Sequence, residues 1–349
     1  MNQGNAGCCW QPFADWQAGQ RKVVYCTRAC RDMAVSAKTL TIGDKKKKQR
    51  IALEGLDRVI FIGVPRCDAA LLYRLVKKGI AVEFLDLFSR PQGILQPLRR
   101  EQLCFWDKQL FFQLQPASRL SLARLIIETK IRNYASLIMK HEGDSSQLSQ
   151  IAVALAQVGD ALTWDALRGH EGHAARLYFE QMASFVGPFS FSGRKKRPSP
   201  DPINSMLSFG YTLLHNRLAY SLEQVGLNPR IGFYHVGRGR HWALASDLME
   251  DLRVMVDRLV IDLVKGGMVM PEDFVMRGNQ CVFRTAKAFT SFVFAFEEVM
   301  SACFTVRFAR PGYPAGSRMN LNQWLDATAK AYAGHITDGA PFHPYRVRR

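Results

Sequence analysis

The hydrophobic pattern of this chain changes character near residue 100. Before that point, β-branched residues gather in short runs separated by turn and charged residues; the runs are RKVVYC, KTLTI, QRIAL and RVIFIG. Such runs predict strands. After that point, apolar residues recur at helical spacing almost to the C-terminus. The sequence therefore predicts an α+β chain with an N-terminal extension (1–19), a small β-rich N-terminal domain (20–99) and a larger all-helical C-terminal domain (100–349).

Several helix boundaries can be predicted from capping residues. Asp201 followed by Pro202 is typical of a helix start, and Gly226 is typical of the position just past a helix end. A later helix is predicted over residues 246–264, with Ser246 as its N-cap. Another is predicted over 163–186 and contains two glycines, each of which costs about 1 kcal/mol relative to alanine. We therefore expect close packing or an approaching ligand at Gly169 and Gly172.

The charge of the chain is strongly positive. Lys and Arg number 47 against 30 Asp and Glu, which gives a formal net charge of +17. The basic residues also cluster, at 45–48, at 194–197, at Arg238 with Arg240, and at 346–349. This pattern favours nucleic acid as the partner, with a membrane surface as the second choice. The N-terminus is unlike a signal peptide and no apolar stretch reaches the ~18 residues of a membrane span. We therefore expect a cytoplasmic protein whose eight cysteines are free thiols.

Acidic residues and a histidine stand together within one basic segment. Asp247 and Glu250 are three residues apart, which places them on one face of the predicted helix, and His235 precedes them. The simpler interpretation is favourable placement at a helix N-terminus plus a Glu250–Arg253 ion pair. The functional interpretation is a metal site, because carboxylates with one imidazole suit Mn²⁺ or Mg²⁺.

Glu171 is a candidate for a third ligand. It lies in GHEGHAARLYF between His170 and His173, and HEGH lacks the i, i+4 histidine spacing of a zinc protease helix. Spacing alone does not decide between a ligand and a solvated charge.

Four stretches of the sequence carry a resemblance to a known family. They are RVIFIGVPRCDAALLYRLVKKGIAVEFLD, LRGHEGHAARLYF, GRKKRPSPDPINSMLSFGYTLL and GLNPRIGFYHVGRGRHWALASDLMEDLRVMVDRLV. The chain resembles the CRISPR-associated spacer-acquisition integrase, the universal larger protein of the CRISPR adaptation module in antiviral defence. The resemblance spans about residues 20–300. It implies a β-rich N-terminal domain used for dimerisation and a helical catalytic domain.

The resemblance also implies roles for individual residues. The metal ligands fall on Glu171, His235 and Glu250, which would bind Mg²⁺ or Mn²⁺, and Asp247 is a further acidic residue counted with them as catalytic. The residues expected to line the site or face DNA are Arg194, Arg197, Asn204, Tyr211, Arg238 and Arg240.

The implied activity is that of a metal-dependent DNA integrase and endonuclease. The 3′-hydroxyl of a captured fragment attacks a phosphodiester at the edge of a repeat by transesterification. The expected partners are double-stranded DNA (captured fragments and the repeat), a second copy of the chain, and a small adaptation partner protein. Two alternatives stay open. One is a non-catalytic DNA-binding or architectural protein, and the other is a nuclease that hydrolyses branched DNA with water as nucleophile.

Overall fold

The computed structural model describes residues 9–10, 22–27, 30, 32–43, 48–86, 91–97, 104–195, 198–235 and 241–347. These residues form two compact units. The first unit contains the described residues up to 97 together with 272–277 and 282–301, and the second contains the others. Most of the predicted extension at 1–19 lies outside the described residues.

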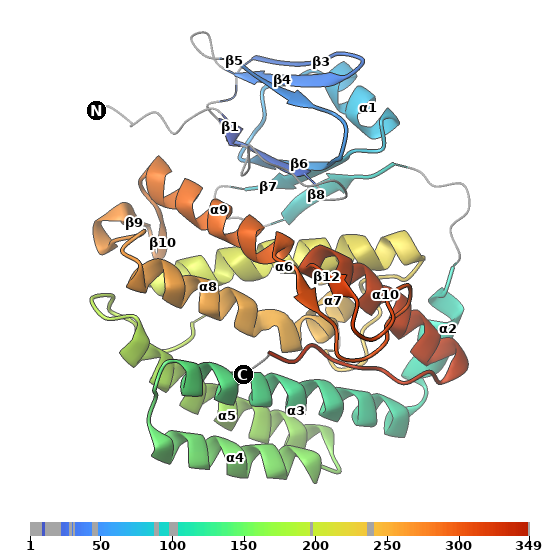
Figure 1. The fold of residues 1–349 in the computed structure, drawn as a ribbon, viewed down its shortest axis with the longest axis vertical. Helices are drawn as coiled ribbons and strands as arrows, with labels where there is room; N and C mark the ends of the chain where they lie inside the picture. The colour runs from blue at the N-terminus through green and yellow to red at the C-terminus, as the bar shows by residue number, and fades with distance from the viewer. Residues whose placement is uncertain are drawn as a thin grey trace. The chain divides into compact units, whose positions relative to one another are not determined.

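A five-stranded sheet organises the first unit (Figure 1). Its centre is a parallel trio, β2 (Lys22–Cys26), β6 (Leu56–Ile62) and β7 (Ala81–Leu85). Short strands pair antiparallel at the two edges, β1 (Cys9–Trp10) on β2 and β8 (Pro91–Leu95) on β7. Strand β6 is buried along nearly its whole length, which explains its continuous run of apolar residues.

A second sheet and one helix complete the core of the first unit. The sheet is an antiparallel meander of β3 (Asp32–Val35), β4 (Thr39–Gly43) and β5 (Lys48–Ala52), and the helix is α1 (Ala69–Lys77). Both sheets and α1 contribute to one hydrophobic cluster, which includes Val24, Leu40, Ile51, Val59, Leu75 and Val82. The strands predicted from the sequence are all present, while β1, β3 and β8 were not predicted.

A segment from late in the sequence also belongs to the first unit. It contains β9 (Phe274–Arg277) and α9 (Ala286–Ser301). A buried hydrogen bond holds α9 there, because the Tyr25 phenol donates to Glu297 Oε1 at 2.6 Å. The sequence predicted a single division near residue 100, which would place this segment in the helical domain. The structure instead places it in the first unit.

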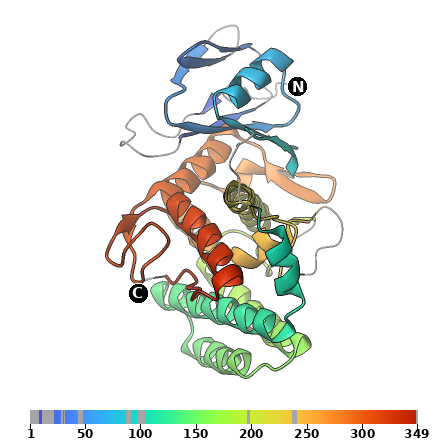
Figure 2. The ribbon, with the colours of Figure 1, turned by 90° about the vertical axis from the view of Figure 1, so that its right-hand side faces the viewer.

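Three helices pack side by side in the second unit (Figures 1 and 2). They are α3 (Pro116–Lys140), α4 (Ser145–Gly159) and α5 (Trp164–Phe185), with the short α2 (Trp106–Gln113) preceding them. The Thr163 hydroxyl caps α5 by accepting from the Ala166 amide.

Helix α6 (Pro202–Val225) lies in the interior of the second unit, buried over most of its length. The predicted boundaries are confirmed: Asp201 accepts from the Asn204 amide at 2.8 Å, and Gly226 ends the helix with a φ of 94°. Helix α10 (Leu321–Asp338) packs against α6.

The structure confirms the predicted α+β class, with a β-rich N-terminal region followed by a mostly helical one. The helical part is not purely helical, because it also contains β10 (Gln280–Phe283), β11 (Phe304–Thr305) and β12 (Arg318–Met319). No helix among the described residues is long and apolar enough to cross a membrane.

The single helix predicted over 246–264 is wrong. The chain forms α7 (Ala243–Leu248), a 3-10 turn η1 (Glu250–Leu252) and α8 (Arg253–Lys265), so Ser246 lies inside a helix and does not cap one. The break has a structural reason. The Asp247 carboxylate binds three backbone amides outside the helix, and the tighter turn carries Glu250 toward a different set of partners.

Candidate active site

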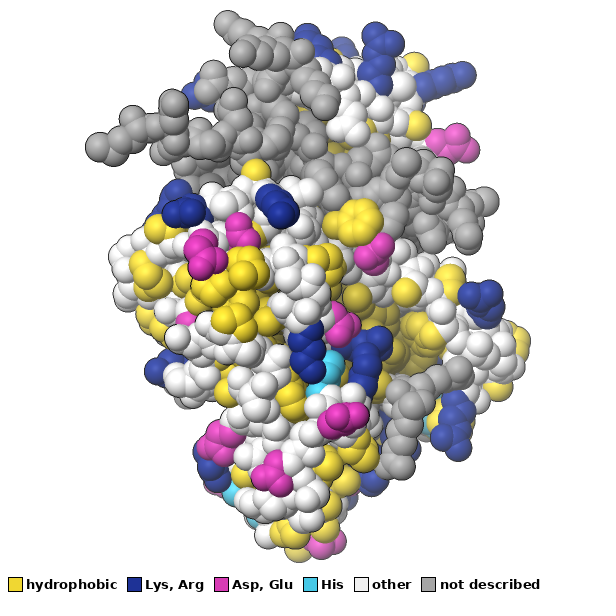
Figure 3. All heavy atoms as spheres, turned by 60° about the vertical axis from the view of Figure 1, so that its left-hand side comes forward, with side chains coloured by type: hydrophobic (Ala, Val, Ile, Leu, Met, Phe, Trp, Pro, Cys, Tyr) yellow, Lys and Arg dark blue, Asp and Glu magenta, His cyan; other side chains and the backbone are white. Residues whose placement is uncertain are grey.

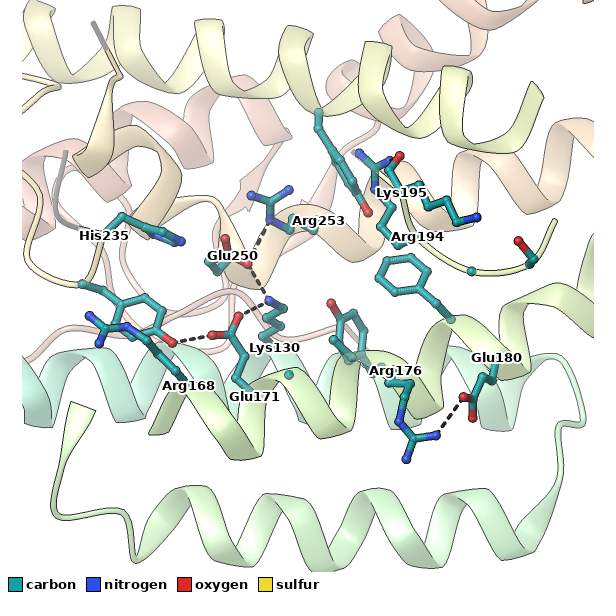
Figure 4. Close-up of a pocket in the computed structure, with 18 of the residues that line it drawn as sticks. Lys130, Arg168, Glu171, Arg176, Glu180, Arg194, Lys195, His235, Glu250 and Arg253 are labelled. Carbon is teal, nitrogen blue, oxygen red and sulfur yellow. Dashed lines mark hydrogen bonds and ion pairs between the residues drawn. The ribbon is translucent and has the colours of Figure 1, made fainter. Parts of the chain in front are cut away.

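A pocket of about 840 Å³ opens in the second unit. Its walls come from α3, α5, α6, α8, η1 and the segments that precede α6 and α7. Figure 4 shows Glu171, Glu250 and His235 at one end, and Arg176, Arg194 and Lys195 toward the other. The pocket therefore combines an end where two glutamates, a histidine and Lys130 meet with a basic end, where Glu180 pairs with Arg176.

Two glutamates from different elements meet on one lysine. The Lys130 ammonium, from α3, lies 2.5 Å from Glu171 Oε1 and 2.7 Å from Glu250 Oε2 (Figure 4). Burial alone would lower the pKa of Lys130, but the two carboxylates raise it well above its ordinary value. The lysine is therefore a permanent positive charge between the two acidic groups.

Glu250 is ionised and held by a second cation. Its Oε2 also accepts from Arg253 Nε at 2.9 Å, which confirms the ion pair predicted from the sequence. Burial would raise the pKa of Glu250, but Arg253 and Lys130 hold it well below its usual value. Glu171 accepts a second hydrogen bond, from the Tyr234 phenol, on its Oε2.

Asp247 orients His235. Its fully buried carboxylate accepts from the backbone amides of Phe233 (2.6 Å), Tyr234 (2.9 Å) and His235 (2.8 Å), and its Oδ1 lies 2.7 Å from His235 Nδ1. Because a carboxylate can only accept, Nδ1 carries the proton and Nε2 of the neutral ring keeps its lone pair for the pocket. Burial would lower the pKa of His235, but the bond to Asp247 raises it.

The carboxylate of Asp247 needs a glycine beside it. A Cβ on Gly232 would lie 2.7 Å from Asp247 Oδ2 and 2.8 Å from Ala243 Cβ, closer than side chains tolerate. The sequence analysis counts Asp247 as a further acidic residue with the catalytic ones. The structure instead makes it a buried acceptor that shapes the loop carrying His235.

The donor types at this end of the pocket fit a divalent cation. Among the residues that the structure describes, no three His, Cys, Asp or Glu side chains are arranged to hold a metal ion as they stand. However, Glu171 and Glu250 already converge on a single cation, the Lys130 ammonium, and His235 lines the same pocket. Carboxylate oxygens with one imidazole nitrogen are ligands that Mg²⁺ and Mn²⁺ accept.

Arg194 and Tyr211 line the pocket, whereas Asn204, which was also expected to line the site, is fully buried and not among the lining residues. The buried Asn204 Oδ1 accepts from Arg194 Nη1 and from the Lys195 amide, both at 2.8 Å, so Asn204 shapes the basic loop. Tyr211 lines the pocket and donates its phenol to the buried Asp257. The Arg194 guanidinium lies over the Tyr211 ring, 5.4 Å from its centroid. The predicted DNA-facing residues Arg197, Arg238 and Arg240 lie outside the described residues.

The sequence analysis missed Lys130 and Tyr234. A signal for Lys130 was present: it lies four residues from Ile126 and four from Tyr134, on the buried face of α3. A lysine at helical spacing with buried residues needs a partner, and here it has two. Close packing was one of two expectations for the two glycines of α5, and it is wrong. A Cβ at Gly169 or Gly172 would meet nothing within 4 Å, so neither is required for packing, but Gly172 lines the pocket.

Comparison with known proteins identifies relatives over most of the chain. The sequence model described as CRISPR associated protein Cas1 matches residues 24–298. A CRISPR-associated endonuclease Cas1 of Thermus thermophilus is 31% identical over 288 residues, which cover 82% of this chain and 87% of the relative. The CRISPR-associated endonuclease Cas1 of Mycobacterium tuberculosis is 32% identical over 257 residues, covering 70% of this chain and 74% of the relative.

Solved structures share the fold. A casposase bound to integration product has a TM-score of 0.76 at 21% identity and covers 92% of each chain. A Cas1 protein from Thermotoga maritima has a TM-score of 0.75 at 20% identity, covering 94% of this chain and 100% of that one. A chain of a Cas6-RT-Cas1–Cas2 complex has a TM-score of 0.74 at 24% identity, covering 93% of this chain and 36% of that one. Since the family model spans most of the sequence and the curated relatives exceed 30% identity, this chain belongs to the Cas1 family of CRISPR-associated proteins.

Proposed function

We propose that this chain is a divalent-metal-dependent DNA integrase and endonuclease of CRISPR adaptation, acting in the cytoplasm. The observation that carries the proposal is the convergence of Glu171 and Glu250 on one cation beside His235. Membership of the Cas1 family and the shared fold with a casposase bound to integration product support the reaction class.

The reaction would exchange one phosphodiester for another. The 3′-hydroxyl oxygen of the captured fragment forms a bond to a phosphorus atom at the repeat edge, and the bond from that phosphorus to the repeat's own 3′-oxygen breaks. The attacking hydroxyl gives its proton to a base, and the departing 3′-oxygen receives a proton and leaves as a hydroxyl, so that no net proton is consumed. A cation held by Glu171, Glu250 and His235 would, when bound, polarise the phosphoryl oxygen and neutralise developing charge.

The chain's own residues have distinct tasks in this scheme. Asp247 fixes the ring of His235, so that Nε2 can serve as a metal ligand or accept the proton of the attacking hydroxyl. Arg253 remains paired with Glu250 and keeps it ionised. At the other end of the pocket, Arg176, Arg194 and Lys195 would bind the phosphates of the strand that enters.

The partners follow from the same proposal. They are double-stranded DNA (the captured fragment and the repeat), a second copy of this chain through its β-rich unit, and a small adaptation protein. One structural relative is part of a Cas6-RT-Cas1–Cas2 complex, which supports assembly with a partner of that kind.

A strand-joining assay tests the proposal. Labelled fragment DNA, a supercoiled plasmid carrying the repeat, the partner protein and Mn²⁺ are mixed with wild type or with Glu171→Gln, His235→Asn or Glu250→Gln. Wild type should join label to the plasmid, and each variant should lose joining by about 10² or more while still binding DNA.

Asp165→Asn is the matched control. It makes the same carboxylate-to-amide change on α5, at a side chain that is 98% exposed, so its joining should equal that of wild type. Shortened strands without joined product would indicate the nuclease alternative. DNA binding without joining or cutting in wild type would indicate an architectural protein and contradict the proposal.

A further inference from the structure

Lys130 stands where a metal-binding site should be anionic. Its side chain is 7% exposed and comes from α3, while its two partners come from α5 and η1. Burying an ammonium costs several kcal/mol unless it is paired, and here pairing is complete because two carboxylates contact one Nζ. The lysine therefore neutralises the acidic end of the pocket without any metal.

Lysine and a divalent cation cannot share this position. Glu171 and Glu250 offer two negative charges, and Lys130 and Arg253 already supply two positive ones. A metal bound by the same two carboxylates would be repelled by an ammonium within about 3 Å of both, in a pocket where screening is weak. One of the two cations must withdraw, and Lys130 is the candidate because its atom bridges both ligands.

The pocket contains an alternative position for the Lys130 ammonium. Its Nζ is 5.8 Å from the centroid of the Tyr134 ring, and Tyr134 lines the same pocket. A flexible four-carbon stem lets an ammonium move from the carboxylates toward that ring face or toward an incoming phosphate, which a planar guanidinium could do less readily.

We propose that Lys130 is a built-in counter-ion that holds Glu171 and Glu250 together in the metal-free protein and is displaced when a divalent cation binds, so that it sets the affinity of the site for metal. This inference rests on the proposed metal site. It assigns to Lys130 a positioning and specificity role for the metal, distinct from the role of the ligands.

Metal titration of a charge-removing variant tests the inference. The full-length chain is freed of metal with EDTA, dialysed and titrated with Mn²⁺ by calorimetry, as wild type and as Lys130→Met, which keeps the length of the side chain. Mn²⁺ should bind Lys130→Met at least about tenfold more tightly, because no ammonium has to be displaced. Without metal, Lys130→Met should melt at a lower temperature than wild type. Mn²⁺ should raise the Tm of Lys130→Met by more than it raises the Tm of wild type.

Lys140→Met is the matched control, because it removes a lysine from the exposed end of the same helix. It should leave Mn²⁺ affinity unchanged. Unchanged or weaker Mn²⁺ binding by Lys130→Met, with normal binding by wild type, would overturn the inference and leave the proposed function standing. Absence of Mn²⁺ binding in both proteins would overturn both.

A second measurement uses wild type alone and does not depend on the folding of a variant. The protein is treated with a limiting amount of an amine-reactive acetylating reagent, with and without Mn²⁺. The peptides acetylated at Lys130 and at Lys140 are then quantified by mass spectrometry. If Mn²⁺ displaces Lys130, the acetylation rate of Lys130 should rise several-fold relative to that of Lys140. An unchanged ratio at saturating Mn²⁺ would contradict displacement.

Discussion

At the scale of single residues, the site depends on one buried carboxylate that does not itself line the pocket. Asp247 accepts three backbone amides and the Nδ1 proton of His235. A carboxylate that accepts from several N–H donors is fixed in position. The direction of the His235 ring is therefore determined by the loop that contains Gly232.

Gly232→Ala should disrupt this arrangement. The new methyl group would lie closer to Asp247 Oδ2 and Ala243 Cβ than van der Waals contact allows, and the carboxylate would have to shift. We expect a loss of about 1–3 kcal/mol in the free energy of unfolding and a fall in strand joining, with DNA affinity retained. Denaturant unfolding and the joining assay measure the two effects.

Gly169→Ala is the matched control for that change. A Cβ at this position meets nothing within 4 Å, and the residue lies inside α5. Alanine should raise stability by up to about 1 kcal/mol and leave joining unchanged. Equal stability losses at the two glycines would show that the close approach at Gly232 is unimportant.

The candidate residues that a family motif carried lie together in the structure, and their roles as metal ligands stay predictions. Glu171, His235 and Glu250 came from a family resemblance, and the structure brings them to one end of one pocket. The role of Asp247 could not be predicted, because it depends on a loop folding back onto a helix. Lys130 was missed because its partners lie 41 and 120 residues away along the sequence.

At the scale of elements, the C-terminal segment is tied to the turn that carries Glu250. Asn133 on α3 donates to the backbone oxygens of Asp251 and Tyr345, both at 2.8 Å, and accepts from the Val347 amide at 3.0 Å. Asp251 Oδ2 accepts from the Tyr345 amide at 2.5 Å. The segment near residue 345 thus holds η1 against α3, next to the Lys130 contacts.

Asp251 makes this junction sensitive to pH. Burial raises its pKa to about 7. In the unfolded chain an aspartate releases its proton near pH ~3.9. Between these two pH values Asp251 is protonated in the folded chain and ionised in the unfolded chain. The folded chain therefore binds one more proton, and the free energy of unfolding should fall as the pH rises from 4 to about 7.

Asp251→Asn should remove that pH dependence. The amide oxygen can still accept from Tyr345, and no ionisation remains. The stability of wild type relative to the variant should fall by up to about 4 kcal/mol between pH 4.5 and 7.5, as measured by urea unfolding at each pH. A constant difference across that range would contradict the raised pKa.

Element boundaries were predicted where local chemistry determines them. Asp201, Pro202 and Gly226 define α6 by capping, and the structure agrees. The segment after His235 was mispredicted because periodicity continues through η1, where tertiary hydrogen bonds break the helix. Strands β3 and β8 were missed because each contains a single β-branched residue, and β8 also contains Pro91 and Gly93, which are typical of turns.

At the scale of the whole molecule, the chain carries a large excess of positive charge. On the face drawn in Figure 3, Lys and Arg side chains are spread among acidic and hydrophobic ones. The formal net charge of +17 would therefore attract DNA at long range, while individual contacts position it.

Lys195→Ala should reduce the salt dependence of DNA binding. Lys195 is exposed at the basic end of the pocket, and each phosphate contact contributes about 0.9 to the slope of log K against log salt. The slope should fall by about one for any DNA sequence, as measured by fluorescence anisotropy over a salt series. Lys330→Ala, an exposed lysine on α10, is the control and should change the slope less.

The class of fold was predictable because hydrophobic period changes once along the chain, near residue 100. The assignment of α9 to the first unit was not predictable, because it depends on contacts such as Tyr25 with Glu297 across the length of the sequence.

The most direct test of the account is to locate the metal. Crystals of the full-length chain soaked in Mn²⁺ should be measured near the manganese absorption edge. The account predicts an anomalous peak bounded by Glu171, Glu250 and Nε2 of His235, with the Lys130 ammonium moved away from both carboxylates. A peak elsewhere, or Lys130 still bridging the two glutamates with Mn²⁺ bound, would contradict it.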